Sequence, residues 1–162
     1  MVKSTRPGTA PITITMLVAL VLVIVPLPDW ARFLRPDIVA MVLIYWCMAT
    51  PEQIGVGIAF ATGLLVDTLT GTLLGQHALG LSIIAYLTLS LYQRIRLFPL
   101  WQQSLFVLVL LTINQALSLW VNGIIGRPIH TLKYWMPSLI GMLLWPVVFK
   151  LLRGVRRQFQ NG

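Results

Sequence analysis

Asp67 is the residue best placed to do chemistry, because it is the only Asp, Glu, Lys or Arg well inside a hydrophobic run of the sequence. A charge buried in a bilayer is expensive, and such a residue usually faces the interior of a helical bundle and marks a proton or substrate site. The structural alternative is a capping role, or an ion pair with a loop arginine such as Arg35. No second intramembrane charge completes a proton relay, so we expect the structural role. If hydrogen bonding is enough, Asp67→Asn should keep much of the function.

Small residues precede Asp67 at intervals of four. Gly55, Ala59 and Gly63 share one face of the predicted helix with the carboxylate. Such spacing lets another helix backbone approach closely. Gly71 and Gly75 continue the spacing into the segment 70–76, whose composition is typical of a turn. This helix and turn are therefore expected to form a core-packing element or a surface that faces a partner.

Polar side chains gather on the fifth hydrophobic run. They are Asn114, Gln115, Ser118 and Asn122, of which the last three share one helical face. In lipid such a stripe turns inward and makes interhelical hydrogen bonds, each contributing about 0.6 kcal/mol. The same residues could instead line a substrate cavity. From the spacing alone we favour interhelical bonding.

The tripeptide Arg35-Pro36-Asp37 precedes the second hydrophobic run. Proline suits the first turn of a helix, and an acidic residue there complements the helix dipole. This pattern predicts a helix start and is a sufficient account of the three residues. A partner-docking role for Arg35 stays open.

The remaining reactive residue types predict no catalytic or metal chemistry. His77 and His130 fall on different predicted loops without nearby acids or cysteines, which makes a poor metal site. Cys47 is a single cysteine in an apolar run, so the sequence offers no disulfide framework. The nucleotide-binding, zinc-protease and hydrolase motifs are all missing. We expect a protein that is not an enzyme and needs no cofactor.

Composition places these residues in a membrane protein. Of 162 residues 57% are hydrophobic and only 10% are charged, whereas a soluble domain carries about 25% charged residues. The mean hydropathy is +0.85. The net charge of +8 comes from clusters between apolar runs, as in topology signals, and not from one basic face. The chain is therefore predicted to be a polytopic membrane protein that binds no nucleic acid.

Six hydrophobic runs with short connections use most of the chain, which predicts one all-α integral-membrane domain over residues 1–162. The expected spans are 11–27, 38–50, 54–70, 78–93, 104–125 and 135–152, and a basic tail follows at 153–162. The second run is short and could be re-entrant or buried in the bundle. The tail is expected to anchor to anionic lipid or to touch a cytoplasmic partner.

Lys and Arg in the loops predict the orientation, because cytoplasmic loops carry the excess of positive charge. With both termini cytoplasmic, that side carries eight basic residues: Lys3, Arg6, Arg94, Arg96, Lys150, Arg153, Arg156 and Arg157. The opposite side carries four: Arg32, Arg35, Arg127 and Lys133. An even number of spans places both termini on the same side of the membrane, which agrees with the basic character of both.

An ordered series of short motifs runs through the chain. They are Pro26-x-Pro28-Asp29, Arg35-Pro36-Asp37 leading into Tyr45-Trp46, Gly63-Leu-Leu-Val-Asp67, Gly71, Leu74-Gly75, Ser82-Ile-Ile-Ala-Tyr86, Trp101-Gln102-Gln103 and Leu144-Trp145-Pro146. In this order and spacing the sequence resembles the bacterial rod shape-determining protein MreD family, most closely its proteobacterial members. The resemblance covers nearly the whole chain, although no single motif is specific.

The resemblance implies a non-catalytic subunit of the cell-elongation machinery in the bacterial cytoplasmic (inner) membrane. Family members associate with MreC and work with MreB, a RodA-type polymerase and its class B penicillin-binding protein in peptidoglycan synthesis. The family's fold is similar to the substrate-binding subunits of energy-coupling-factor vitamin transporters. Such a transporter subunit is the alternative function, and it would use a ligand pocket lined by the polar residues of the fifth run.

Overall fold

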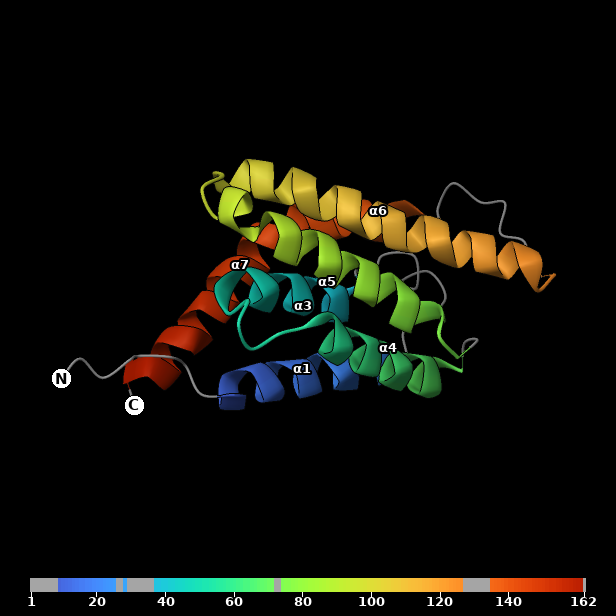
Figure 1. Cartoon of the computed structure of the whole chain (residues 1–162), viewed down its shortest axis with the longest axis horizontal. Helices are drawn as coiled ribbons and strands as arrows, with labels where there is room; N and C mark the ends of the chain where they lie inside the picture. Colours follow the sequence, from blue (N-terminus) through green and yellow to red (C-terminus); the bar gives the residue numbers. More distant parts are fainter. Residues whose placement is uncertain (1–8, 26–27, 29–36, 72–73, 127–134, 162) are drawn as a thin grey trace.

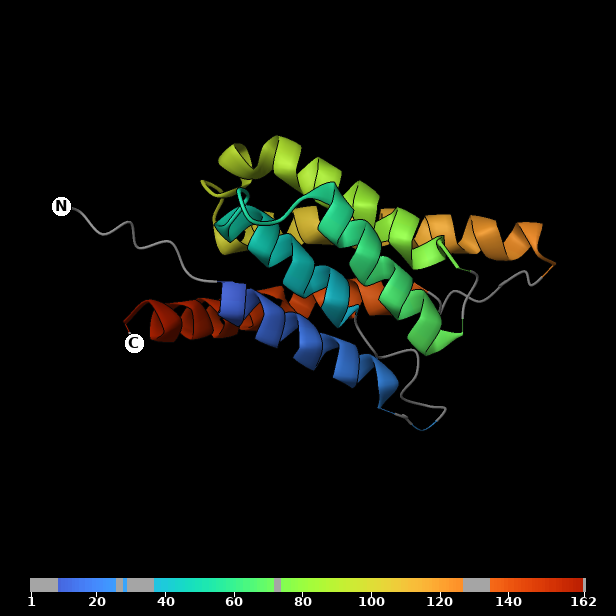
Figure 2. The same cartoon turned by 60° about the horizontal axis from the view of Figure 1, so that its bottom comes forward.

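The computed structural model describes residues 9–25, 28, 37–71, 74–126 and 135–161, which contain helices and no strand. The helices, in chain order, are α1 (Thr9–Ile24), α3 (Ile38–Ala49), α4 (Val56–Thr70), α5 (Gln76–Ile95), α6 (Leu100–Ile124) and α7 (Met136–Asn161). They lie side by side along the long axis of the molecule (Figures 1 and 2). The predicted all-helical class is confirmed.

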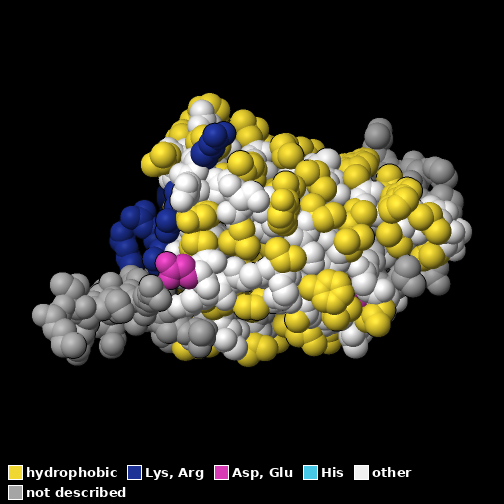
Figure 3. Space-filling model, in the orientation of Figure 1, with side chains coloured by type: hydrophobic (Ala, Val, Ile, Leu, Met, Phe, Trp, Pro, Cys, Tyr) yellow, Lys and Arg dark blue, Asp and Glu magenta, His cyan; other side chains and the backbone are white. Residues whose placement is uncertain are grey.

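Successive helices run in opposite directions, which gives the bundle two ends (Figure 1). At the cavity end, α1, α4 and α6 end while α3, α5 and α7 begin. The basic end is the opposite end, where α1 begins and α7 ends (Figure 1). Every Lys and Arg among the described residues belongs to the basic end, where Figure 3 shows the basic side chains gathered. They are Arg94, Arg96, Lys150, Arg153, Arg156 and Arg157.

Helix α3 forms the centre of the core. All of its residues from Val39 to Met48 are buried, as expected for a helix that is apolar on every side. Its twelve residues extend about 18 Å, against roughly 30 Å for the hydrocarbon core of a bilayer. The surrounding helices therefore enclose this short run. The Trp46 indole Nε1–H also donates to Thr15 Oγ1 at 2.8 Å, which joins α3 to α1.

Within the described ranges, three helices are long and apolar enough to cross a membrane by themselves: α5, α6 and the Met136–Gln158 part of α7. The other three are shorter apolar helices. Large apolar side chains remain exposed along the long helices, among them Trp120 at 65% and Leu143 at 71%. Apolar side chains are also spread over the face shown in Figure 3. Apolar surface this extensive is suited to contact with lipid.

Helix α7 is longer than the hydrophobic run predicts. It continues to Asn161, so the expected basic tail at 153–162 forms the last turns of this helix over its described part. Pro146 lies inside the helix, as neighbouring helices allow in membrane bundles. The buried Trp145 beside it donates from its indole Nε1 to Gln103 Oε1 of α6 at 3.4 Å. The basic residues of the tail are thus carried on a helix that packs on α6.

Candidate functional site at the cavity end

The Asp67 carboxylate is buried where the end of α4 meets the start of α5. Its Oδ2 accepts hydrogen bonds from the backbone N–H groups of Gly75 at 2.8 Å and Ala78 at 3.4 Å. Its Oδ1 accepts from the backbone N–H of His77 at 2.9 Å and lies 2.7 Å from the His77 ring Nδ1. The first N–H groups of a helix have no partner within that helix. Asp67 of α4 therefore caps α5.

Two glycines shape the turn that makes this capping possible. Gly71 ends α4 with φ of +70°, and Gly75 precedes α5 with φ of +103°. Both values lie in the left-handed region, which glycine adopts without strain. The Gly71 N–H also donates to the backbone oxygen of Asp67. The turn thus folds α5 back so that its first N–H groups face the side chain of Asp67.

The small residues Gly55, Ala59 and Gly63, which share one face of the predicted helix, lie in two different environments. A Cβ on Gly63 would lie 2.2 Å from Ala78 Cα, so α5 starts directly against this glycine. Ala59 is fully buried. A Cβ on Gly55, by contrast, would meet nothing within 4 Å. Gly63 and Ala59 therefore serve core packing, and a partner surface on α4 would have to use other residues.

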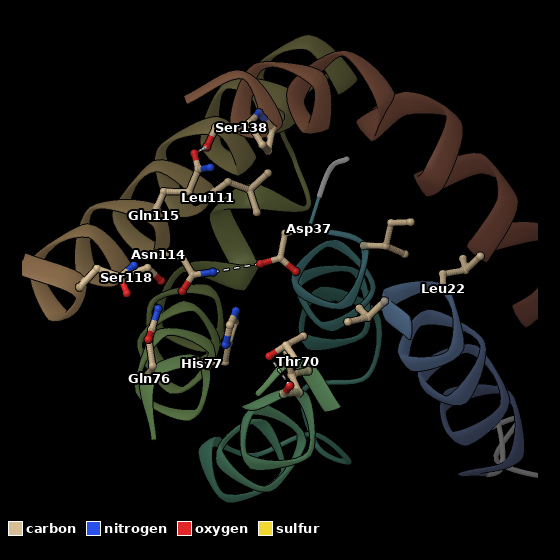
Figure 4. Close-up of a pocket in the computed structure, with 15 residues that line it drawn as sticks. Leu22, Asp37, Thr70, Gln76, His77, Leu111, Asn114, Gln115, Ser118 and Ser138 are labelled. Carbon is tan, nitrogen blue, oxygen red and sulfur yellow. Dashed lines mark hydrogen bonds between the residues drawn. The ribbon is translucent and has the colours of Figure 1, made fainter. Parts of the chain in front are cut away.

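A cavity of about 350 Å³, lined by many polar side chains, lies beside the place where Asp67 caps α5. Side chains from all the described helices surround it (Figure 4). Apolar positions of α1 and α3 form one side, and hydrogen-bonding side chains from α4 to α7 form much of the rest. The lining residues with polar side chains are Asp37, Thr70, Gln76, His77, Asn114, Gln115, Ser118, Asn122 and Ser138. The predicted polar residues of the fifth run therefore all reach one cavity.

Asp37 and Asn114 meet at the centre of the cavity (Figure 4). Asp37 is the N-cap of α3, where its Oδ1 accepts from the Ala40 N–H at 3.1 Å. Its Oδ2 accepts from Asn114 Nδ2 at 3.0 Å, which links α3 to α6. The buried Asn114 Oδ1 has no hydrogen-bond partner in the described part of the chain, and it lies where a Cβ on Gly80 would be. A helix thus starts where it was predicted, but Asp37 is its N-cap and not a residue of its first turn, and Arg35 and Pro36 lie outside the described residues.

Of the other polar residues of α6, one forms a hydrogen bond to another helix and two line the cavity. Gln115 Oε1 accepts a hydrogen bond from the Ser138 hydroxyl of α7. Ser118 and Asn122 line the cavity nearer the end of α6. The two sequence-based alternatives, interhelical bonding and a cavity wall, therefore both describe this face. Asn114 and Gln115 join helices, and all four residues border the same space.

This arrangement is suited to hydrogen bonding more than to acid–base or metal chemistry. Asp67 and His77 are in contact, but in the described ranges no three His, Cys, Asp or Glu side chains come together as metal ligands would. Asp37 and Asp67 both act as helix caps. His130, the second predicted histidine, lies outside the described residues. The cavity can offer donors and acceptors to a polar group.

Sequence reasoning missed three contributors to the fold of this region. His77 was expected on an isolated loop, yet it contacts Asp67, and no periodicity connects residues ten apart across a turn. Gly80 gives room to the Asn114 side chain of another helix. Gln103 donates to the carbonyl oxygens of Ile95 and Phe98 and so closes the turn between α5 and α6 at the basic end. Only a structure pairs such distant positions.

The fold and its exposed apolar surface define a helical membrane protein. The chain matches the family model described as rod shape-determining protein MreD over residues 8–155. It is also 35% identical over 145 residues to the rod shape-determining protein MreD of Haemophilus influenzae, with 87% of each chain covered. No solved structure matches this chain. The chain belongs to the MreD family of rod shape-determining membrane proteins, which confirms the resemblance found in its motifs.

Proposed function

We propose that this chain is a non-catalytic membrane subunit of the rod elongation complex, where it binds MreC and helps to position or activate peptidoglycan synthesis. Membership of the MreD family is the observation that carries the proposal. The chemistry of the cavity end supports it, because the buried carboxylate of Asp67 is engaged in capping a helix. A bundle of this kind acts through its surfaces.

The proposed location is the bacterial inner membrane, with six helices in the bilayer and both termini cytoplasmic. The predicted loop charges support this orientation, since they favour the side of the termini by eight to four. The described Lys and Arg residues all lie at the basic end. In this orientation the basic end faces the cytoplasm, where MreB acts, and the cavity end faces the periplasm.

The proposed partners are MreC first, with MreB, a RodA-type polymerase and a class B penicillin-binding protein in the same complex. Two exposed apolar surfaces are open to a partner helix. One is a recess of about 380 Å³ between α1, α3 and α7, which includes Val18 and Leu151. The other is the outer face of α4, where Phe60 and Leu65 are exposed. Ala59 is buried and Gly63 packs against α5, so neither residue is available to a partner.

Crosslinking in native membranes tests the proposal. A photoreactive amino acid is placed at Val18 or Leu151, and in matched strains at Phe60 or Leu65. After gentle solubilisation, the crosslinked and co-purifying proteins are identified by mass spectrometry. We expect MreC crosslinked from one of the two faces and absent from the other, with the polymerase pair in the same eluate.

Two results would overturn this function. Absence of MreC from every crosslinked and co-purified sample, at normal levels of both proteins, would remove the partnership. Recovery of paired ATPases with a coupling membrane subunit would instead indicate the substrate-binding subunit of an energy-coupling-factor type transporter. The polar cavity around Asn114 and Gln115 would then be the place to look for its ligand.

A further inference from the structure

Three arginines from two distant segments converge on a small recess at the basic end. Arg96 follows the end of α5, whereas Arg153 and Arg156 lie on successive turns of α7. Together they line a pocket of about 120 Å³, here called the arginine pocket. Its other lining residues are Tyr45, Met48, Ala49, Gln103 and Phe149. The sequence placed these arginines only in a general cytoplasmic cluster, so their convergence is a finding of the fold.

The positive charge of the arginine pocket is not neutralised within the described part of the chain. No ion pair joins its guanidinium groups to any described carboxylate, and Glu52, at the same end, does not line the pocket. Arg156 Nε is buried without a hydrogen-bond partner among the described residues, while the guanidinium group also interacts with the Tyr45 side chain. Of the groups that the structure describes, the Arg96 side chain reaches only the Ala49 carbonyl oxygen at 3.4 Å and the face of the Tyr92 ring. A buried donor of this kind favours an anionic acceptor from outside the chain.

The depth of the pocket indicates which anion is nearby. The twenty residues of α5 extend about 30 Å, so Arg96 at its end lies close to one boundary of the hydrocarbon core. Trp101, 63% exposed at the start of α6, is typical of the headgroup region. Leu97 and Phe98 next to Arg96 expose apolar surface. A group bound in the pocket would therefore lie at phosphate depth with acyl chains beside it.

We propose that the arginine pocket binds the phosphate of an anionic phospholipid. Guanidinium groups match phosphate oxygens with paired hydrogen bonds, and basic pockets between transmembrane helices suit lipid headgroups. The volume equals about four waters at roughly 30 Å³ each, enough for a phosphate but not for a whole headgroup with its chains. The bound lipid would join the end of α5 to the last turns of α7. This inference depends on the membrane class of the protein and not on the proposed partnership with MreC.

Native mass spectrometry of the full chain in neutral detergent, titrated with phosphatidylglycerol, tests the site. The triple variant Arg96→Gln/Arg153→Gln/Arg156→Gln should raise the Kd of the first bound lipid by about tenfold or more. The matched control Arg94→Gln/Lys150→Gln/Arg157→Gln removes the same charge from the same end but spares the pocket. For this control we expect a change of less than about twofold. Phosphatidylcholine should bind more weakly than phosphatidylglycerol to the unmodified chain.

A gentler variant covers the case in which the triple substitution does not fold, as judged by gel filtration and helical circular dichroism. Arg156→Lys keeps the charge but loses the planar fork of donors, and should raise the Kd by about threefold. Equal losses in the two triple variants, or retention of the lipid by the pocket variant, would overturn the inference. So would displacement of the lipid by inorganic phosphate at millimolar concentration, because the ligand would then be the free anion.

Discussion

The two ends of the bundle use charge in opposite ways. At the cavity end, the Asp37 and Asp67 carboxylates accept hydrogen bonds from backbone N–H groups, and Asp37 also accepts from Asn114. At the basic end, none of the described cations forms an ion pair with a described carboxylate. Asp37 and Asp67 are thus built into the fold, and the arginines of the basic end remain open to groups outside it.

This difference follows from where each charge lies. Inside a low-dielectric bundle an unpaired charge is costly, so a carboxylate persists there only when donors surround it. The start of a helix supplies such donors. At the membrane boundary, water and lipid phosphates solvate a guanidinium, and the fold need not do so. Stability should therefore depend mainly on the cavity end, and interactions with the surroundings mainly on the basic end.

The largest loss of stability is expected from Gly63→Ala. The new Cβ would lie 2.2 Å from Ala78 Cα and 2.4 Å from Ala78 N, so α4 and α5 must separate and the Asp67 caps must stretch. We expect the free energy of unfolding, measured in dodecylmaltoside–SDS mixed micelles, to fall by about 3 kcal/mol. Gly63→Leu should prevent accumulation of the protein.

Gly57→Ala is the matched control on the same helix. A Cβ at Gly57 would meet nothing within 4 Å, so only helix propensity changes. That change should stabilise the protein by about 1 kcal/mol or less. If the two substitutions had equal effects, the close approach of α5 to Gly63 would be wrong.

Asp67→Asn is expected to lower the free energy of unfolding by about 2 kcal/mol, because hydrogen bonds to a charged acceptor are lost. Both carboxylate oxygens face N–H donors, from Gly75 and Ala78 on one side and His77 on the other. An amide has one acceptor oxygen, and its NH₂ group would face donors. The sequence alone predicted that Asp67→Asn keeps much of the function. The geometry adds that the same substitution should clearly lower the stability of the protein.

Thr68→Val gives the control for Asp67→Asn, because Thr68 is exposed and bonds only within its own helix, to the Leu64 carbonyl oxygen. Mixed-micelle unfolding and rescue of rod shape in cells lacking the chromosomal copy provide the two readouts. Full stability of Asp67→Asn would refute the capping geometry. Normal stability with complete loss of rod shape would instead assign the charge a functional role.

Asp37→Ala should have a smaller effect, about 1.5 kcal/mol, of which the lost N-cap of α3 contributes about 1 kcal/mol. The remainder comes from Asn114, whose Nδ2 loses its acceptor. A double-mutant cycle of Asp37→Ala with Asn114→Ala should give a coupling energy of about 0.6 kcal/mol, the average for interhelical hydrogen bonds in membranes. A coupling energy of zero would show that the contact between α3 and α6 has no energetic role.

Local patterns predicted what local physics decides. The hydrophobic runs predicted the helices, and Arg35-Pro36-Asp37 predicted the start of α3, although Asp37 is the N-cap of this helix and not a residue of its first turn. The spacing of Gly63 and Asp67 predicted a close neighbour, but not that the neighbour is α5 or that Gly55 faces open space. Which helix meets which depends on packing among all six, and a period of four within one helix carries no such information. The cavity and the arginine pocket follow from that packing, so neither was predicted as a defined space.

The smallest effect on stability is expected at the basic end, from Arg153→Gln. The Arg153 side chain is exposed and makes no ion pair with a described carboxylate, so neutral detergent should solvate either side chain. The free energy of unfolding in dodecylmaltoside–SDS should change by no more than about 0.5 kcal/mol. A loss as large as that of Asp37→Ala would show that Arg153 is engaged within the fold and that the two ends do not differ as argued. A different result is that the variant loses stability relative to the wild type only when phosphatidylglycerol is added to both proteins. That result would strengthen the contrast between the two ends, because the basic end would then contribute to stability through bound lipid.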